Sequence, residues 1–338
     1  METKPSFRIK EEDLLEKRIS DLGLQISQSV FSPLIQKLYH ELDQKGLVFR
    51  PPCFLADEWF APVGVPAIGI PFFLAHPRLR KLEQKIILEV EGGTRATFMK
   101  LIRHEAGHAY SYAYGLYKKK RWRRLFGLAS KEYPDTYKPR PYSHSYVQHL
   151  ENWYAQSHPD EDFAETFAVW LTPGLNWKRR YRGWKAFGKL EYVDKLMKSI
   201  MGKSPRVRPH FNPDEYSGLR IKLKTYYRNK KKQCQESYPD FYDNDLKALF
   251  TDDPDERSDT KAYRYLTRSH EKILRSVAFW TKEKKYTIDQ LMRDLIYRCR
   301  GLNLYIRKEN GHLDFEVSSF ITSLVTTYLH TGTFKRSK

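Results

Sequence analysis

The sequence predicts an α+β protein, and three observations indicate this class. Apolar residues recur at helical spacing over 94–116 and 159–171, as they do in helices that bury one face. Two apolar runs, at 47–49 and 67–74, have the length and composition of short strands. Beyond 203–217, a segment with three prolines, the pattern is mainly helical. We therefore expect a small sheet packed with helices, followed by a mainly α-helical C-terminal region.

The first elements are a helical segment and two strands. Between residues 11 and 46 apolar positions recur every three or four residues, which predicts helix. The pattern changes at Leu47-Val-Phe, where the first strand is expected. Pro71 lies inside the second apolar run, and because proline cannot donate a ladder hydrogen bond, we expect an edge strand there.

Three helical segments follow. Thr94 has the side chain of an N-cap, and the apolar stripe after it predicts a helix to about Leu116. A second segment is predicted over 146–156. A third begins at Pro159, because proline suits the first helical position, and it runs to Leu171, where a Thr-Pro-Gly sequence ends it.

The C-terminal region carries further helix signals. Thr287-Ile-Asp-Gln has the pattern of a capping box that opens a helix, and another helix is predicted over 314–330, ended by Gly332. The acidic run at 251–260 is expected to be a solvated loop. The predicted regions are an N-terminal helical segment at 1–46, a central α+β domain at 47–203 and a mainly helical region at 204–338.

The composition describes a basic, folded chain. Lys and Arg number 60 against 41 Asp and Glu, a net charge of +19, and aromatic residues make up 14%. The first 200 residues carry 32 basic and 23 acidic residues and the remainder 28 and 18, so the excess of +9 and +10 is evenly distributed. Such a field attracts nucleic acid, acidic peptides or an anionic membrane surface.

The cysteines and the N-terminal residues indicate the cellular compartment in which the protein is expected. Cys53, Cys234 and Cys299 lie far apart, which excludes a CxxC zinc ribbon and suits a reducing environment. The N-terminus lacks the apolar stretch of a secretory signal. The longest apolar run, 60–75, contains three prolines and is too short for a transmembrane segment. We expect a cytoplasmic protein.

A metal-binding motif stands in the first strong helix. Residues 104–108 read His-Glu-Ala-Gly-His, the HExxH pattern. Because positions four apart share a helix face, His104 and His108 can both point at one ion. Glu105 follows beside the open side of that ion, where a carboxylate can take a proton from a metal-bound water.

A catalytic zinc site needs a third protein ligand. The extended pattern HExxHxxGxxH fails, because Ser111 and Tyr114 occupy the required Gly and His positions. A later helix offers Glu161 and Glu165, which are four apart and share a face. An acidic first helical turn can also simply complement the helix dipole, and we assign that role to Asp160 and Asp162. Further candidates for the third ligand are His144, His149 and His158.

The motif and the later helix together resemble a known family. Tyr154-Ala-Gln-Ser-His-Pro-Asp-Glu161-Asp-Phe-Ala-Glu165, placed after HExxH, is similar to a segment of bacterial zinc-binding metallopeptidases of gluzincin type. More distantly it resembles the anthrax lethal factor catalytic domain and the Pro-Pro endopeptidases, which have an ExFAE segment and a tyrosine seven residues before its first glutamate. The resemblance covers roughly 65–200, and Phe163 and Phe167 replace the tryptophans of the nearest pattern.

This resemblance implies a zincin-like catalytic domain and a role for each matching residue. His104, His108 and Glu161 would bind Zn²⁺, and Glu105 would be the general base. Glu165 would accept a hydrogen bond from a ligand histidine and fix its tautomer. The hydroxyl of Tyr154 would donate a hydrogen bond to the developing oxyanion.

Basic and aromatic residues interleave in two clusters, 118–124 and 177–185. Such clusters are typical of surfaces that bind nucleic-acid bases by stacking or that bind acidic peptides, and also of ordinary solvated helix faces. Lys230-Lys-Lys is expected to be a surface loop.

The sequence thus favours a zinc metallopeptidase whose substrate is a protein or peptide, acidic in character. The alternatives are a nucleic-acid-associated zinc protein or protease, and a non-catalytic zinc scaffold. DNA-linked proteases of the SprT type use a third histidine, which the Glu161 match disfavours.

Overall fold

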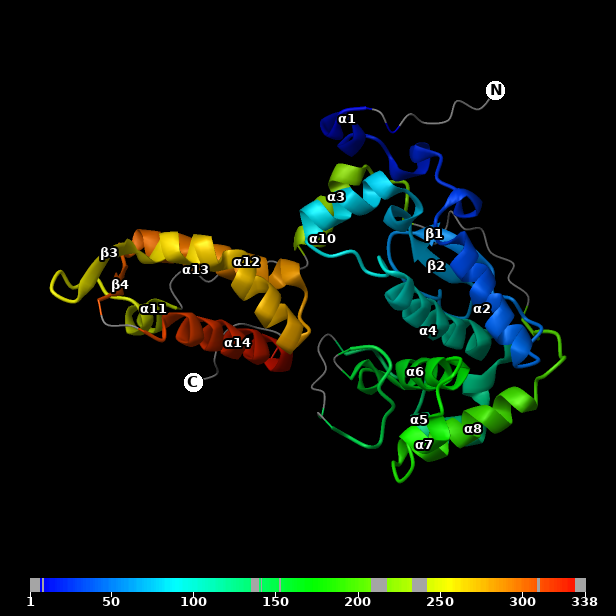
Figure 1. Cartoon of the computed structure of the whole chain (residues 1–338). Coiled ribbons are helices and arrows are strands. Elements are labelled where there is room, and N and C mark those ends of the chain that lie inside the picture. Colours follow the sequence, from blue (N-terminus) through cyan, green and yellow to red (C-terminus); the bar gives the residue numbers. More distant parts are fainter. Residues whose placement is uncertain are drawn as a thin grey trace. The chain divides into compact units, whose positions relative to one another are not determined.

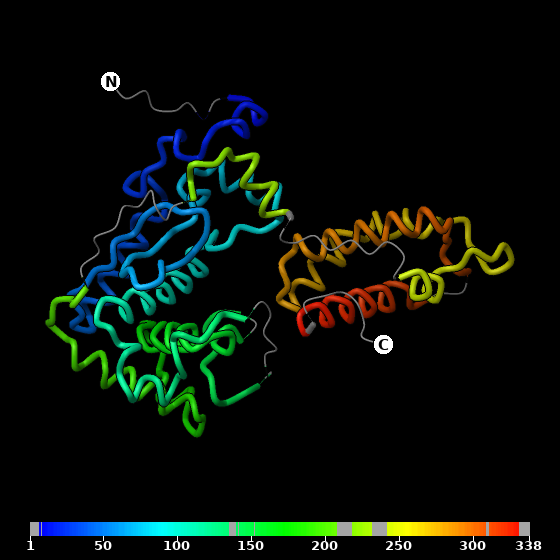
Figure 2. The backbone as a smooth tube through the Cα atoms, turned by 180° about the vertical axis from the view of Figure 1, so that it is seen from behind, coloured from blue at the N-terminus to red at the C-terminus, as the bar shows by residue number. Residues whose placement is uncertain are grey.

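The computed structural model divides the chain into two compact units, Met1–Ile86 with Val90–Arg228, and Ile87–Glu89 with Asn229–Lys338. Both units are rich in helix, and the described part of each holds a two-stranded sheet (Figure 1, Figure 2). This confirms the α+β class. The structure describes residues 7, 9–134, 140, 142–151, 153–207, 218–232, 242–308 and 311–331.

The elements are as follows. In the first unit they are α1 (Glu11–Leu15), α2 (Ser32–Gln44), β1 (Cys53–Ala56), β2 (Ile68–Pro71), α3 (Pro77–Ile87), α4 (Arg95–Tyr114), α5 (Lys120–Phe126), α6 (Pro159–Leu171), α7 (Trp177–Arg180), α8 (Ala186–Lys198) and the start of α10 (Leu223–Lys232). In the second unit they are α11 (Asp243–Leu249), β3 (Arg257–Lys261), α12 (Ala262–Thr281), α13 (Lys285–Gly301), β4 (Tyr305–Arg307) and α14 (Leu313–Thr331).

The small sheet of the first unit is a parallel pair. β1 and β2 run in register with Cys53 opposite Ile68. On the other side of β2, the N–H of Gly69 donates to the carbonyl of Phe60 at 2.8 Å, in an isolated bridge. β2 ends at Pro71, which has no N–H to continue a ladder. The rest of the second predicted run forms a 3₁₀ helix.

The strand expected at 47–49 is wrong. The N–H of Leu47 donates to the carbonyl of Leu42 at the end of α2, at 3.0 Å. The carbonyl of Phe49 accepts from the hydroxyl of Tyr110 on α4, at 2.5 Å. Two backbone groups that a neighbouring strand would need are therefore bonded to helices, and the first strand starts later, at Cys53.

The helical structure expected between 11 and 46 is only partly present, as α1 and α2. Between α1 and α2 the chain forms two 3₁₀ turns, Ile19–Leu22 and Ile26–Gln28. Gly23 ends the first turn with φ +59°, a left-handed conformation that stops a helix. The side chains that made the pattern periodic are buried all the same: Leu14, Ile19 and Leu22.

The two helices predicted with the strongest signals are confirmed. α4 begins after Thr94, whose hydroxyl accepts from the N–H of Thr97 in a capping box, and it ends at Gly115 with φ +60°. α6 spans the predicted residues, from Pro159 to Leu171. After the proline every residue of α6 is buried, so this helix forms the centre of the first unit, with α4 directly beside it (Figure 1).

The helix predicted at 146–156 is wrong. The described residues before 152 form turns and bends, and only Tyr154–Gln156 makes a 3₁₀ turn. The reason is visible in the backbone hydrogen bonds. The N–H groups of His149 and Leu150 donate to the carboxylate of Glu165, at 3.3 and 2.8 Å, instead of to helical carbonyls.

The second unit is a helical hairpin with a third helix against it. α12 and α13 lie side by side and α14 packs on α12 (Figure 2). Their facing side chains, including Leu266, Leu274, Leu291 and Ile321, form a continuous buried core. β3 and β4 form an antiparallel pair. Among the described helices none is long and apolar enough to cross a membrane.

Three local expectations in the C-terminal region need correction. The predicted start at Thr287 is wrong, because α13 begins at Lys285 and Thr287 is buried inside it. Lys230–Lys232 end α10 and are not a loop. The acidic run at 251–260 is only partly loop, since its last residues belong to β3. The last predicted helix is present as α14, and Gly332 lies outside the described residues.

Candidate metal centre

α4 and α6 approach each other closely at one glycine. A Cβ added to Gly107 would lie 2.8 Å from the Cα of Ala164 and 3.2 Å from the Cβ of Phe167. The first distance involves backbone, which cannot rotate away, so only glycine fits between the helices. Tyr110, one turn further along α4, stacks on the Phe167 ring with centroids 5.3 Å apart. The fourth residue of HExxH therefore sets the spacing between the two helices.

Two buried ion pairs fix the same helices to the rest of the unit. Arg103 donates to both carboxylate oxygens of Glu41 on α2, at 2.7 and 2.8 Å. Lys189 on α8 lies 2.5 Å from the carboxylate of Asp162 on α6. Asp162 was expected only to complement the helix dipole, and it is in addition ion-paired. Bidentate and charge-assisted bonds of this kind define an orientation as well as a contact.

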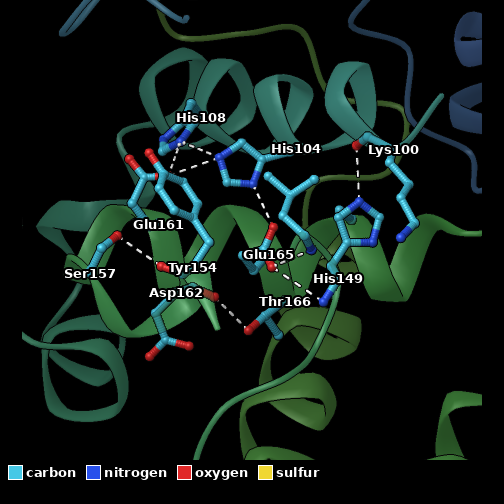
Figure 3. Close-up of polar contacts among 12 residues, drawn as sticks. Lys100, His104, His108, His149, Tyr154, Ser157, Glu161, Asp162, Glu165 and Thr166 are labelled. Carbon is cyan, nitrogen blue, oxygen red and sulfur yellow. Dashed lines mark hydrogen bonds and ion pairs between the residues drawn. The ribbon is translucent and has the colours of Figure 1, made fainter. Parts of the chain in front are cut away.

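The predicted ligand residues converge between α4 and α6 (Figure 3). His104 Nε2 lies 2.8 Å from Glu161 Oε2, and His108 Nε2 lies 3.2 Å from the same oxygen. The two Nε2 atoms are 3.1 Å apart. Three ligands held about 2.1 Å from one tetrahedral ion are about 3.4 Å apart. Two nitrogens and one oxygen therefore already have nearly the spacing of a zinc site.

Glu165 holds the orientation of His104. Its Oε1 accepts from Nδ1 of His104 at 2.9 Å, which leaves Nε2 facing Glu161. Its Oε2 accepts the amide N–H groups of His149 and Leu150. The side chain is fully buried. With both oxygens occupied, Glu165 supports the centre from behind, and Figure 3 shows it on the side of His104 away from His108.

Two tyrosines border the centre. The ring centroid of Tyr154 is 5.7 Å from that of His104, and Figure 3 shows its side chain pointing toward the histidines. Tyr133, which the sequence analysis missed, donates its hydroxyl to Oε1 of Glu161 at 2.9 Å and stacks on His158 with centroids 3.8 Å apart. Tyr133 thus occupies one oxygen of Glu161 and leaves the other toward the histidines. No spacing rule connects this loop tyrosine to the motif.

The electrostatics of the centre come from burial and from close opposite charges. Burial raises the pKa of Glu105, and the neighbouring histidines only partly offset it. Burial would lower the pKa of His108, but the carboxylate of Glu161 outweighs it and the pKa is raised. For Glu161 the same histidines outweigh burial and hold the pKa well below its usual range. Among the described residues none donates a hydrogen bond to the buried carboxylate of Glu105.

The competing histidines have other partners. His158 caps α6 by accepting the N–H of Asp160 at 3.1 Å, as its position before the proline suggested. His149 donates Nε2–H to the carbonyl of Lys100 at 2.9 Å. His144 stacks on Trp184, with centroids 4.2 Å apart. Among the described residues, the one group of three possible metal ligands within reach of a common ion is His104, His108 and Glu161.

Comparison with known proteins agrees with this geometry. No curated protein and no solved structure matches the chain. Residues 86–173 match a family model described as "Putative zinc-binding metallo-peptidase". The matched segment contains both α4 and α6, and with them every residue of the centre. This part of the chain is therefore similar to zinc-binding metallopeptidases.

Proposed function

We propose that the protein is a zinc-dependent peptidase with His104, His108 and Glu161 as metal ligands. The convergence of these three side chains between α4 and α6 is the observation that carries the proposal. The match to a zinc-binding peptidase family supports it. We further propose that 47–203 form a zincin-like catalytic domain, flanked by 1–46 and 204–338.

The donor set suits zinc. Imidazole nitrogens and one carboxylate oxygen, at near-tetrahedral separations, are ligands that a catalytic zinc takes while keeping a position open. The hydrogen bond from Tyr133 leaves Glu161 one oxygen for the ion. Bound zinc would polarise the scissile carbonyl and acidify its coordinated water.

Side chains beside the proposed metal site would carry out the proton transfers. Glu105 follows the first ligand histidine, and its raised pKa brings it closer to neutral pH, where a general base is most efficient. It would take the proton of the attacking water and return it to the leaving amine. Tyr154 would donate to the oxyanion that forms at the former carbonyl oxygen. Glu165 would keep His104 in the tautomer that presents Nε2.

Metal analysis of single variants tests the ligands. We expect about one zinc per wild-type chain, with most of it lost in His104→Ala and Glu161→Ala. Glu165→Ala should lose less than Glu161→Ala, and the reverse order would exchange the roles of the glutamates. His144→Ala is the matched control, because this histidine stacks on Trp184 away from the centre. Full zinc in both ligand variants would refute the site.

Activity separates an enzyme from a zinc scaffold. Glu105→Gln keeps the shape of the side chain and removes the proton acceptor, so zinc should stay while peptide cleavage falls about 10²–10⁴-fold. A proteome-derived peptide library, digested by wild type and variant in parallel, gives the measurement. A scaffold would have no use for a base beside its metal. Cleavage that persists in Glu105→Gln would contradict the mechanism.

A further inference from the structure

The second unit has a groove with no part in the proposed peptidase centre. It has a volume of about 870 Å³ and lies between α12 and α13. Its lining includes four arginines and two tyrosines: Arg264, Arg268, Arg293, Arg300, Tyr263 and Tyr297. All of these residues belong to one compact unit, so the groove depends on no contact with the first unit.

The groove concentrates positive charge beyond the average of the chain. Residues 262–301, which form the hairpin, carry ten Lys and Arg against four Asp and Glu. Arg264 and Arg268 are four apart on α12, where like charges repel and weaken a helix. In the described part of the second unit neither of them, nor Arg300, forms an ion pair with a carboxylate. The one acidic lining residue, Glu271, is bonded to Arg275 at 2.7 Å.

Two of the four arginines are held by contacts with neighbouring side chains. Arg300 lies over the ring of Tyr263, 4.8 Å from its centroid. Arg293 donates one N–H to Asp289 at 2.6 Å, and Asp289 is bonded on its other oxygen to His270. A guanidinium has five N–H donors, so both arginines keep most of theirs for a ligand. Four guanidinium groups lining one groove, two of them held by neighbouring side chains, suit the binding of several phosphates.

An exposed aromatic ring stands among these charges. Tyr297 lines the groove with 72% of its surface exposed, although burying a tyrosine ring is favourable. Charge alone would serve an acidic peptide equally well. An open ring beside guanidinium groups is the arrangement that binds unpaired bases, because every base has a face to stack. Duplex nucleic acid keeps those faces covered. We therefore infer that the α12–α13 groove binds single-stranded nucleic acid.

Salt dependence provides the quantitative test on the full chain. The probe is a fluorescein-labelled oligothymidylate of about 20 nucleotides, followed by fluorescence anisotropy. If four arginines contact phosphates, the logarithm of the binding constant should fall with log salt at a slope of about −2.8, about fifty-fold between 50 and 200 mM. Arg264→Gln combined with Arg268→Gln should halve that slope and leave about a sevenfold change.

A matched control separates the groove from net charge. Lys284→Gln combined with Lys285→Gln removes the same charge from the same hairpin, at the start of α13 and outside the lining. We expect its slope to equal that of wild type. Equal losses in the two double variants would attribute binding to the overall charge and overturn the inference. Circular dichroism of each variant verifies that the helices are intact.

The aromatic ring decides between nucleic acid and acidic peptide. Tyr297→Ala should weaken oligonucleotide binding about tenfold, because one stacked base is lost, and leave the salt slope unchanged. Poly-D-glutamate, an acidic chain without rings, should compete only weakly. If Tyr297→Ala binds like wild type and poly-D-glutamate competes as well as the oligonucleotide, the groove is an acidic-peptide site and the inference fails.

Discussion

Replacing Gly107 with alanine tests whether α4 and α6 must touch for the metal centre to form. The added methyl carbon would meet the Cα of Ala164 at 2.8 Å, whereas carbon atoms in contact are about 3.5–4.0 Å apart. The helices must then separate by up to about 1 Å at the level of the ligands. Metal–ligand distances tolerate about 0.2 Å. His104 and His108 on one helix and Glu161 on the other should no longer reach a common ion.

The energetic consequence follows from two opposing effects. Alanine favours a helix by about 1 kcal/mol over glycine, while overpacking a rigid contact costs about 1–3 kcal/mol. Because the obstacle at Gly107 is backbone, we expect the upper part of that range and a net loss of about 1–2 kcal/mol in the free energy of unfolding. Zinc affinity should fall at least tenfold, since a ligand displaced by about 1 Å forms a poor bond.

A second glycine in a helix gives the control. Gly188 lies inside α8, and nothing lies within 4 Å of a Cβ built there, so Gly188→Ala should stabilise by up to about 1 kcal/mol. Urea unfolding of the metal-free proteins measures the first effect, and competition with a chromogenic chelator measures the zinc affinity. If Gly107→Ala is as stable as Gly188→Ala and binds zinc like wild type, the close approach is not required and the reasoning is wrong.

Four further predictions concern the centre and its substrate. Tyr133→Phe removes the hydrogen bond to Glu161 and keeps the ring stacked on His158. Because a half-exposed hydrogen bond contributes about 1 kcal/mol, zinc affinity should fall several-fold. An unchanged dissociation constant for zinc would assign Tyr133 to packing. Tyr154→Phe should lower turnover about 10²–10³-fold with little change in KM and full zinc content, whereas a merely packed ring would leave kcat intact. Protons compete with zinc for imidazole, and because the pKa of His108 is raised, the zinc affinity measured by chelator competition should already fall as the pH is lowered toward 6.5; an affinity that stays constant down to pH 6 would contradict the charge environment. With a net charge of +19, acidic peptides should be cleaved faster than basic ones at low salt, and the difference should shrink as salt screens the field; rates independent of peptide charge would leave the basic clusters as ordinary surface.

The sequence predicted correctly the helices whose ends are marked by a capping residue or a proline. Thr94 and Gly115 bound α4, and Pro159 opens α6, because caps and a fixed φ act within one turn. Between α1 and α2 the buried side chains of Ile19 and Leu22 continued the helical periodicity although the backbone there forms only 3₁₀ turns. At 146–156 the competing interaction came from a distant residue, Glu165, whose carboxylate binds two backbone N–H groups. The residues near 146–156 in the sequence do not reveal that a distant carboxylate will bind their backbone.

The residues of the candidate site were likewise predicted only in part. Helix spacing and the match to the gluzincin segment predicted which residues to bring together, and the structure places His104, His108 and Glu161 within reach of one ion. Tyr133 could not be found, because it lies in a loop and meets Glu161 only through the fold. Gly107 could have been noticed only as a residue of low helix propensity inside a predicted helix. Its meaning depends on Ala164, which belongs to another helix.

The two glutamates of α6 show why position alone does not assign a role. Both are buried and one turn apart, and both contact His104. Glu165 binds Nδ1 with one oxygen and two backbone N–H groups with the other, so no oxygen remains directed at the histidine Nε2 atoms. Glu161 has one oxygen bonded to Tyr133 and the other 2.8 and 3.2 Å from those two nitrogens. The hydrogen bonds that each carboxylate already accepts therefore favour the proposed assignment, in which Glu161 is the third ligand and Glu165 orients the first.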